Sequence, residues 1–501
     1  MPETAASAQS LTAPTAREAA LKALAAYRRG KSLPDEALEQ SIAAMAARDS
    51  ALAMKLLYGV LQNMALCDYY ISYYSSIKLN RIEPRVLDIL RLSVYQIVFM
   101  TRIPHRAAVN EGVSLCAKHA GQRTVRYVNA VLRKVSQAAG ASSLPPVTGS
   151  NFEEILSVRY SHPLQLVRKL CEDLGAEDAE QFMAENNSDE VPVCVQVNTL
   201  LTDTDEVLRE LCAEEINASP HDWLMSCVQL RSAGDITRLT AFRKGHIYVQ
   251  DAASRLAVTA AALQPGMFVL DGCAAPGGKS FASSIDMKNS GRVISIDITR
   301  EKLLRITQGA ERLGISNIET VLNSPRDDNA GRDSVCESSV CESSAGAAAA
   351  GGDIPGEGVA DGDIPGGGVT GVSTAYAAFT GKADVVIADV PCSGFGVIRK
   401  KPDIRYKDMH AIDRLPGVQK DILQKLSECV KPGGALLYST CTVLRRENED
   451  VISSFLAENV DFSLESFTLP HIGTVIDGYC TLLPHIHGSD GFFICRLRRK
   501  P

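Results

Sequence analysis

Two cysteines that follow two expected strands could carry covalent chemistry. Cys392 lies after a proline in the segment 389–394, and Cys441 lies after a threonine in the segment 438–442. A single buried cysteine is most often a small apolar residue, but two thiols at the ends of neighbouring strands favour a reactive pair. A thiolate can add to an electrophilic ring, and Asp389 could hold the proton on a ring nitrogen that makes the ring electrophilic. The two cysteines therefore predict covalent catalysis on a ring substrate.

A glycine-rich turn upstream of both cysteines is typical of a nucleotide-type cofactor site. A strand is expected to end at Leu270, Asp271 follows it, the loop contains Gly277 and Gly278, and a helix is expected from Ser280. Such a turn lets backbone amides approach a polar cofactor, whereas a tight strand-to-helix turn without a ligand is the alternative. The turn is not the GxGxxG of dinucleotide enzymes, which disfavours an NAD site. Asp297 ends the next strand 19 residues after Gly278, as expected for a carboxylate on ribose hydroxyls, so the pattern predicts an adenosine-bearing cofactor.

Basic residues gather after the first thiol and again further along the chain. They are Arg399, Lys400, Lys401, Arg405 and Lys407, then Arg445 and Arg446, then four of the residues 496–500. A solvated loop is the alternative, but their adjacency to the expected thiols favours contacts with nucleic-acid phosphates.

The elements that must position these residues alternate between strands and helices. Buried-strand candidates occur at 267–270, 292–296, 384–388 and 435–438, with helices expected at 300–313 and 416–429. Alternating strands and helices predict a parallel sheet with helices on both faces and a cofactor at the carboxyl ends of the strands.

The N-terminal part differs from the rest in pattern and charge. From residue 15 to about 135 the apolar spacing is helical and hairpin signals are absent, so an all-α domain is expected. Residues 1–140 carry 18 Lys and Arg against 10 Asp and Glu, a charge of +8, which leaves −15 for the rest of the chain. A basic module joined to an acidic body is expected when one part docks on phosphates, although a merely solvated basic face explains the charge equally well. A linker at 140–146 leads into a small α/β unit over 150–250, with a strand at 192–198.

Residues 329–379 interrupt the strand and helix pattern with low-complexity sequence. An alanine-rich stretch and a repeated Gly-Asp-Ile-Pro-Gly cannot bury enough apolar surface to offset ordering entropy. We expect a disordered surface insertion without a catalytic role, and a bland linker rather than a metal site at Cys336 and Cys341.

Composition limits the class of protein. The 501 residues are 45% hydrophobic, which is ordinary for several globular domains, and no stretch approaches the roughly 20 apolar residues of a membrane span. The 14 cysteines contain no CxxC pair and no grouping with histidines at zinc spacing. We expect reduced thiols in a soluble cytoplasmic protein, a monomer that needs neither a membrane nor a metal.

These residues closely resemble the Sun/RsmB family of bacterial ribosomal RNA (cytosine-5) methyltransferases. The family's signature turn, its Pro-Cys motif and its Thr-Cys motif appear at 271–279, 389–394 and 439–442, and its C-terminal motif recurs at 483–493. The helical region resembles the NusB-type RNA-binding domain of these enzymes, through the segments at 56–61, 107–111 and 128–133.

The resemblance implies a multidomain fold of three parts. They are an all-α NusB-like RNA-binding domain at 15–137, a small α/β RNA-contacting unit at 150–250, and an α/β Rossmann-like methyltransferase domain at 251–500 that carries the insertion at 329–379. It further implies S-adenosylmethionine as the cofactor, held by Cys273, Ala274, Ala275, Pro276, Gly277, Gly278, Lys279, Asp297 and Asp389.

The resemblance also assigns the two thiols. Cys441 is implied as the nucleophile that attacks carbon 6 of a flipped-out cytosine so that carbon 5 takes the methyl group, while Cys392 assists proton removal and release, with Asp389 in the same site. The chain departs from the family pattern at two positions. Asn323 stands where the family usually has an acidic residue that contacts the adenine, and Asp327 is the residue expected to replace it. Gln196 stands where an arginine is common.

The expected substrate is RNA, by family analogy small-subunit ribosomal RNA. Transfer RNA is the alternative substrate, which the helical domain disfavours. A non-catalytic RNA-binding or ribosome-assembly factor is the alternative from another class, and the presence of both cysteines disfavours it, because a retired site has no chemical need for two thiols.

Overall fold

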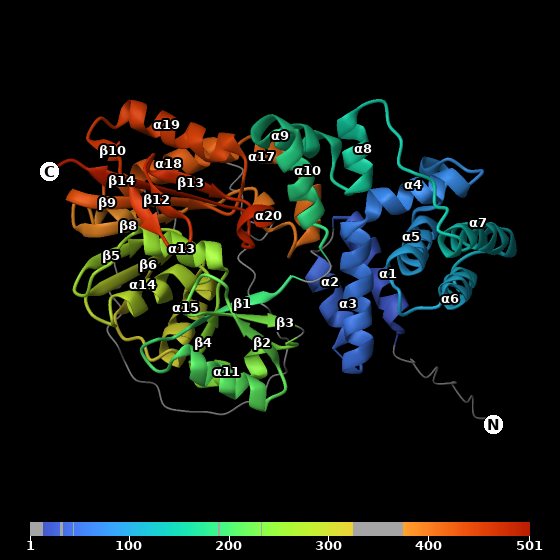
Figure 1. The fold of residues 1–501 in the computed structure, drawn as a ribbon, viewed down its shortest axis with the longest axis horizontal. Coiled ribbons are helices and arrows are strands. Elements are labelled where there is room, and N and C mark those ends of the chain that lie inside the picture. Colours follow the sequence, from blue (N-terminus) through green and yellow to red (C-terminus); the bar gives the residue numbers. More distant parts are fainter. Residues whose placement is uncertain (1–13, 31–33, 44, 189–190, 232, 324–373) are drawn as a thin grey trace, which may run out of the picture. The chain divides into compact units, whose positions relative to one another are not determined.

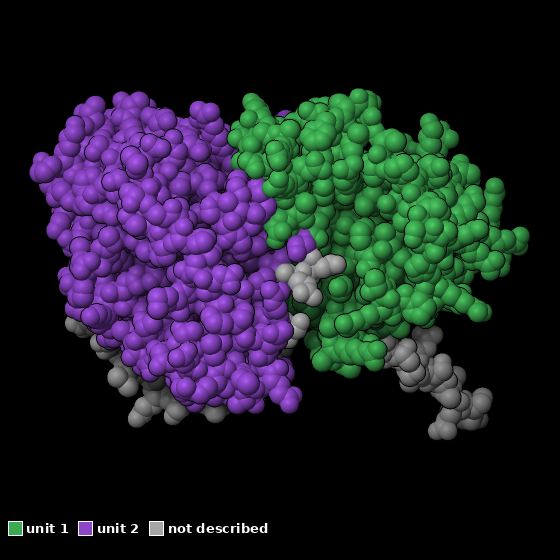
Figure 2. All heavy atoms as spheres, viewed as in Figure 1, with its two compact units in different colours: residues 1–187, 401–406 green, residues 188–400, 407–501 purple. Residues whose placement is uncertain are grey.

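The computed structural model describes residues 14–30, 34–43, 45–188, 191–231, 233–323 and 374–501 (Figure 1). The chain divides into two compact units. The first comprises Met1–Asn187 and Lys401–Tyr406, and the second comprises Ser188–Lys400 and Lys407–Pro501 (Figure 2).

Every regular element described in the first unit is a helix, as the apolar spacing predicted. They are α1 (Ala16–Arg28), α2 (Pro34–Ile42), α3 (Ala47–Gln62), α4 (Met64–Tyr74), the short η1 (Leu79–Arg81), α5 (Pro84–Phe99), α6 (His105–Ala117), α7 (Gln122–Gly140), α8 (Phe152–Arg159), α9 (Leu164–Leu174), α10 (Ala176–Glu185) and η4 (Pro402–Tyr406). Local sequence explains the helix starts. Thr15 and Glu18 form a capping box at α1, and Pro84 occupies the first turn of α5, where its missing N–H is not needed.

The division of the structure does not coincide with the expected boundary at residue 150. Helices α8, α9 and α10 belong to the first unit, which continues to Asn187. Helix α9 buries Leu166, Val167 and Leu170, but nothing local in the sequence indicates which unit its buried face contacts.

The second unit begins with a four-stranded antiparallel sheet of order β2-β3-β1-β4. Its strands are β1 (Val193–Val197), β2 (Asn217–Pro220), β3 (Cys227–Arg231) and β4 (Ile247–Val249), accompanied by α11 (Thr204–Ala213), η2 (Ile236–Arg238) and α12 (Thr240–Arg243). This is the small α/β unit expected from the strand at 192–198.

A larger sheet follows in the order β10-β14-β9-β8-β5-β6-β7, with β13 paired to β14. Its strands are β5 (Phe268–Asp271), β6 (Arg292–Asp297), β7 (Ile318–Leu322), β8 (Ala383–Asp389), β9 (Val430–Thr440), β10 (Phe462–Leu464), β13 (Tyr479–Leu482) and β14 (Phe492–Arg499). Strands β5 to β9 are parallel, and β14 joins them antiparallel to β9. A separate pair is formed by β11 (Phe467–Leu469) and β12 (Gly473–Val475).

Helices cover both faces of this sheet, which confirms the predicted Rossmann-like architecture. The helical elements of this part of the chain are α13 (Ala252–Ala260), α14 (Gly278–Asp286), α15 (Arg300–Arg312), α16 (Thr374–Ala377), η3 (Phe395–Val397), α17 (Met409–Ile412), α18 (Leu415–Ser427), η5 (Arg445–Glu447), α19 (Glu449–Glu458) and α20 (Pro484–His487). One core packs α13, α14 and α15 against Val269 and Val385, and the other packs α18 and α19 against Leu270 and Val386 (Figure 1). Successive strand residues face opposite cores, as the alternation of side chains along a strand requires.

The expected insertion at 329–379 is too long at its C-terminal end. Its residues up to 373 lie outside the described residues, but α16 is formed within the last six. There Tyr376 is buried and its hydroxyl donates to the carbonyl of Gly272 at 2.9 Å. Composition alone could not separate this one aromatic anchor from the low-complexity sequence that precedes it.

Across the described ranges, no helix combines the length and the apolarity that a membrane span requires.

Candidate active site

The two thiols meet where β8 and β9 end. These strands are parallel neighbours, with Asp389 opposite Ser439 in the register. Because parallel strands end at the same edge of a sheet, the segments that follow them emerge side by side. The Sγ atoms of Cys392 and Cys441 lie 3.1 Å apart, so the structure brings together the two cysteines that the sequence singled out.

The two thiols occupy unlike surroundings. Cys392 is 5% exposed, whereas Cys441 is partly exposed. The contact with the Cys441 thiol, then burial, and then the negative charges of Glu447 and Asp389 hold the pKa of Cys392 well above its usual range. Cys392 therefore keeps its proton at neutral pH and can exchange it with a neighbour, while Cys441 is the thiol that a substrate can reach.

Both oxygens of Asp389 are held in place. Its Oδ2 lies 2.7 Å from the Nζ of Lys279, and its Oδ1 accepts a hydrogen bond of 2.7 Å from the hydroxyl of Ser439. Lys279 also donates to Ser254 at 2.8 Å and lies over the ring of Phe492. Lys279 is only 4% exposed, and its ammonium fixes the orientation of the Asp389 carboxylate.

The cofactor loop runs from the end of β5 to the start of α14. Its backbone is pinned to both neighbouring strands, because Gly272 donates to the carbonyl of Ile387 at 2.9 Å and Ala274 donates to the carbonyl of Ile296 at 3.0 Å. Gly277 has φ +108°, a conformation that favours glycine, and a side chain there would meet the ring of Phe281. The loop is therefore built for close backbone approach at the first turn of a helix.

Asp271, at the start of this loop, holds the fold rather than a ligand. Its Oδ2 accepts from the Ser280 hydroxyl at 2.7 Å, and Ser295 donates to Ser280 at 2.7 Å, which ties β5, α14 and β6 together. Burial raises the pKa of Asp271 to about 7, and the Ser280 hydrogen bond and Lys279 oppose this shift.

Asp297 closes the other side of the loop. Its Oδ2 accepts from the backbone N–H of Ala275 at 3.2 Å, and its Oδ1 accepts from those of Ile298 and Thr299 at 2.8 and 3.3 Å. The carboxylate is still partly exposed, and the side chain of Ile298 beside it is 51% exposed. An accessible carboxylate suits ribose hydroxyls and a neighbouring apolar side chain suits an adenine ring, so these residues fit an adenosine-bearing cofactor such as S-adenosylmethionine. Sequence reasoning missed Ile298, although an apolar residue directly after a strand-end carboxylate is a usable signal.

The structure contradicts the expected phosphate role of Arg399, Lys400 and Arg405. Arg399 and Lys400 are engaged in a cluster with Asp251 and Asp490, with Lys400 Nζ 2.6 and 2.7 Å from the two carboxylates and Arg399 Nε 2.9 Å from Asp490. Arg405 is also buried, in the first unit, and donates to backbone carbonyls there. Arg399, Lys400 and Arg405 are therefore engaged by groups of the protein itself.

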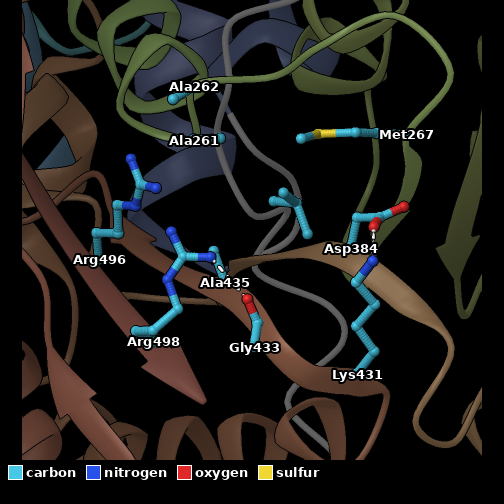
Figure 3. Close-up of a pocket in the computed structure, with 10 residues that line it drawn as sticks. Ala261, Ala262, Met267, Asp384, Lys431, Gly433, Ala435, Arg496 and Arg498 are labelled. Carbon is cyan, nitrogen blue, oxygen red and sulfur yellow. Dashed lines mark hydrogen bonds and ion pairs between the residues drawn. The ribbon is translucent and has the colours of Figure 1, made fainter. Parts of the chain in front are cut away.

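The structure also contradicts the expectation that the C-terminal arginines Arg496 and Arg498 contact phosphates beside the thiols. In the register of β14 with β9, Phe493 lies opposite Thr440 and Arg498 lies opposite Ala435. Arg498 therefore lies toward the ends of the strands that are farthest from the thiols. There Arg496 and Arg498 line a pocket of about 260 Å³ together with Lys431 (Figure 3). Both arginines are ion-paired with Glu465.

Two functional candidates follow the second thiol and were missed. Glu447 and Asn448 are fully buried beside the two cysteine segments. As an acidic and an amide residue ahead of α19, they resemble an ordinary helix start in sequence, so no local signal distinguished them.

Within the described residues, no group of three or more histidine, cysteine or acidic side chains could hold a metal ion, and the 12 cysteines described are free thiols.

Comparisons with known proteins agree with this architecture. The family described as 16S rRNA methyltransferase RsmB/F matches residues 258–334 and 370–498, the NusB family matches 14–137, and an RsmF/B-like ferredoxin-like domain matches 162–237.

Relatives extend over nearly the whole chain. The chain is 32% identical to the probable ribosomal RNA small subunit methyltransferase B of Bacillus subtilis (strain 168), over 97% of this chain and 98% of that protein. It is 30% identical to the ribosomal RNA small subunit methyltransferase B of Shewanella oneidensis, over 95% and 98%. The crystal structure of PH0851, 22% identical, covers 98% of this chain and 100% of its own with a TM-score of 0.71, which shows a shared fold.

Proposed function

The chain belongs to the RsmB/F family of 16S rRNA methyltransferases, with the NusB-like domain, and on this premise we propose that it methylates carbon 5 of a cytosine in small-subunit ribosomal RNA. The family is one of S-adenosylmethionine-dependent RNA methylation. The observation that carries the finer proposal is the pair of thiols at adjoining strand ends, 3.1 Å apart and unequal in exposure.

Cys441 is the nucleophile in this proposal. A flipped-out cytosine can approach it because this thiol is partly exposed, whereas Cys392 is buried. The deprotonated Cys441 sulfur forms a bond to carbon 6 of the ring, and the electron pair of the 5,6 double bond is displaced toward carbon 5.

Asp389 serves the ring during this addition. Its carboxylate is fixed by Lys279 and Ser439, so it can accept a hydrogen bond from a protonated ring nitrogen and keep there the proton that makes carbon 6 electrophilic. S-adenosylmethionine, held by the loop at 273–279 and by Asp297, supplies the electrophilic methyl group for carbon 5.

Cys392 acts in the release step. Carbon 5, once methylated, must lose its proton, and the bond between carbon 6 and the Cys441 sulfur must break so that the double bond re-forms. Cys392 lies against the leaving sulfur and keeps its proton at neutral pH, so it can give that proton to the departing Cys441 sulfur while its own sulfur takes up the proton lost from carbon 5.

The test is to identify the product. The purified chain is incubated with methyl-labelled S-adenosylmethionine and protein-free 16S rRNA, with transfer RNA in a parallel reaction, and the nucleosides are separated by mass spectrometry. We expect label in 5-methylcytidine from 16S rRNA. Label only in transfer RNA supports the alternative substrate, label in another nucleoside refutes the cytosine-5 assignment, and RNA binding without label supports the non-catalytic assembly factor.

A further inference from the structure

Glu447 holds the segment that carries Cys392. Its Oε2 accepts from the backbone N–H of Ser393 at 2.8 Å and from the side-chain amide of Gln419 at 3.0 Å. The same Gln419 amide donates to the carbonyl of Pro391 at 2.9 Å. Both chain neighbours of Cys392 are thus linked by hydrogen bonds to the Glu447 carboxylate. Ser393 is bonded to it directly, and Pro391 is linked to it through Gln419.

Asn448 holds the segment that carries Cys441. Its Oδ1 accepts from the hydroxyl of Thr440 at 2.6 Å, and its Nδ2 donates to the carbonyl of Thr442 at 3.0 Å. Both chain neighbours of Cys441 are therefore hydrogen-bonded to the side-chain amide of Asn448.

The two sets of hydrogen bonds come from the consecutive residues Glu447 and Asn448. The Cα atoms of Glu447 and Asn448 are separated by a single peptide unit of about 3.8 Å, so the Cys392 segment and the Cys441 segment share one short and stiff connection. Tyr438 on β9 fixes its position, because the Tyr438 hydroxyl donates to the backbone carbonyl of Glu447 at 2.6 Å. The segments also touch directly where the hydroxyl of Ser393 donates to that of Thr442 at 2.8 Å.

Burial makes the loss of any of these hydrogen bonds costly. Glu447, Asn448, Thr440 and Gln419 are each fully buried, so water does not compete for their hydrogen bonds and an unmade bond is costly. None of these bonds involves a residue of the loop at 273–279. Burial raises the pKa of Glu447, which agrees with a side chain used for its acceptor geometry.

We propose that Glu447 and Asn448 are positioning residues that set the spacing and orientation of the Cys392 and Cys441 thiols. The inference rests on the proposed function for its catalytic meaning. The positioning role itself can be tested independently of the proposed reaction, because the spacing of two thiols can be measured without any methyl transfer.

The first measurement uses disulfide formation as a ruler. Diamide oxidises two thiols to a disulfide and is itself reduced to the hydrazine, and the rate of the Cys392–Cys441 link is followed by mass spectrometry of the joined peptides. We expect Asn448→Ala and Glu447→Ala to slow this rate and to lower kcat by about 10- to 100-fold, the cost of misplacing reacting groups by about 1 Å. The KM for S-adenosylmethionine should stay unchanged.

Two variants serve as controls. Glu447→Gln keeps an acceptor for Ser393 and Gln419 and should retain both rates. Asn459→Ala, at the far end of α19, removes bonds to Gln424 and the Phe455 carbonyl without touching either cysteine segment, and should also leave both rates unchanged.

A milder variant covers the case in which an alanine variant fails to fold. Thr440→Val removes only the hydroxyl donated to Asn448, and it should slow disulfide formation in the natural chain but add nothing in the Asn448→Ala background. Unchanged rates in Asn448→Ala and Thr440→Val would overturn the proposal, as would fully additive effects of the two. A dependence of disulfide rate on Asn448 in a chain that methylates no RNA would leave the positioning role standing and reject the proposed function.

Discussion

Replacement of Lys400 by methionine tests the buried charge cluster most sharply. The cluster holds two cations, Arg399 and Lys400, against two carboxylates, Asp251 and Asp490, whose side chains are only 6% and 5% exposed. Lys400→Met keeps the shape of the side chain and leaves one cation for two buried carboxylates.

The expected loss follows from that imbalance. Removing one partner of a buried ion pair costs about 3–5 kcal/mol, and because the Lys400 side chain is 27% exposed we place this case near the lower end, about 3 kcal/mol. The control is Lys420→Met, which breaks a pair with Glu458, a carboxylate with 60% of its side chain exposed, and should cost at most about 1 kcal/mol.

The assay is urea unfolding at pH 7 followed by the fluorescence of Trp223. This is the single tryptophan of the chain and lies in the second unit with the cluster, so it reports on the part that is perturbed. Adding Asp490→Asn to Lys400→Met should recover part of the loss, because one carboxylate then faces one cation.

The stability loss of Lys400→Met should also change with pH in a predictable direction. Burial raises the pKa of Asp490, and the loss of Lys400 raises it further, so the folded variant binds more protons than its unfolded chain above the ordinary carboxyl range. The deficit of Lys400→Met should therefore shrink as the pH falls from 7 to 5. A loss no larger than that of Lys420→Met, or a deficit that grows on acidification, would refute the reasoning.

Three further outcomes are expected. Because the pKa of Cys392 lies well above its usual range and the residue is buried, iodoacetamide at pH 8 should label Cys441 before Cys392, and preferential labelling of Cys392 contradicts this. Asp271, with a pKa of about 7 when folded, binds more protons folded than unfolded between roughly pH 4 and 7, so stability falls as the pH rises through that window. Asp271→Asn should flatten that slope in urea unfolding, and an unchanged slope contradicts the assignment. A chain lacking residues 330–372 should keep its methyl-transfer rate, whereas a deletion that continues to 378 removes Tyr376 and its bond to Gly272 and should lower the rate; equal rates for both deletions contradict the anchoring role.

Strand ends and helix faces were predictable because their signals are local. Short apolar runs ending at Leu270, Ile296 and Ala388, each followed directly by an aspartate, predicted strands of a parallel sheet, and strands of such a sheet expose their ends at one edge. The closeness of Cys392 and Cys441 followed from that topology without any knowledge of side-chain contacts.

The roles of the charged and polar residues were not predictable, because their partners are remote in sequence. Lys400 looked like a phosphate contact, but its partners Asp251 and Asp490 are 149 and 90 residues away. Glu447 contacts Ser393, 54 residues earlier. A single sequence carries no periodicity that reveals such pairs, so the distinction between a solvated charge and a buried one appears only in the folded chain.

The most direct measurement compares the two cysteine variants for covalent RNA adducts on one denaturing gel. Each variant is incubated with S-adenosylmethionine and 16S rRNA. We expect Cys392→Ala to give a ribonuclease-sensitive band of protein joined to RNA, because addition proceeds and release fails. We expect Cys441→Ala to give neither adduct nor methyl transfer while still binding RNA. An adduct or methyl transfer with Cys441→Ala, or no adduct with Cys392→Ala, would contradict the roles proposed for the two thiols.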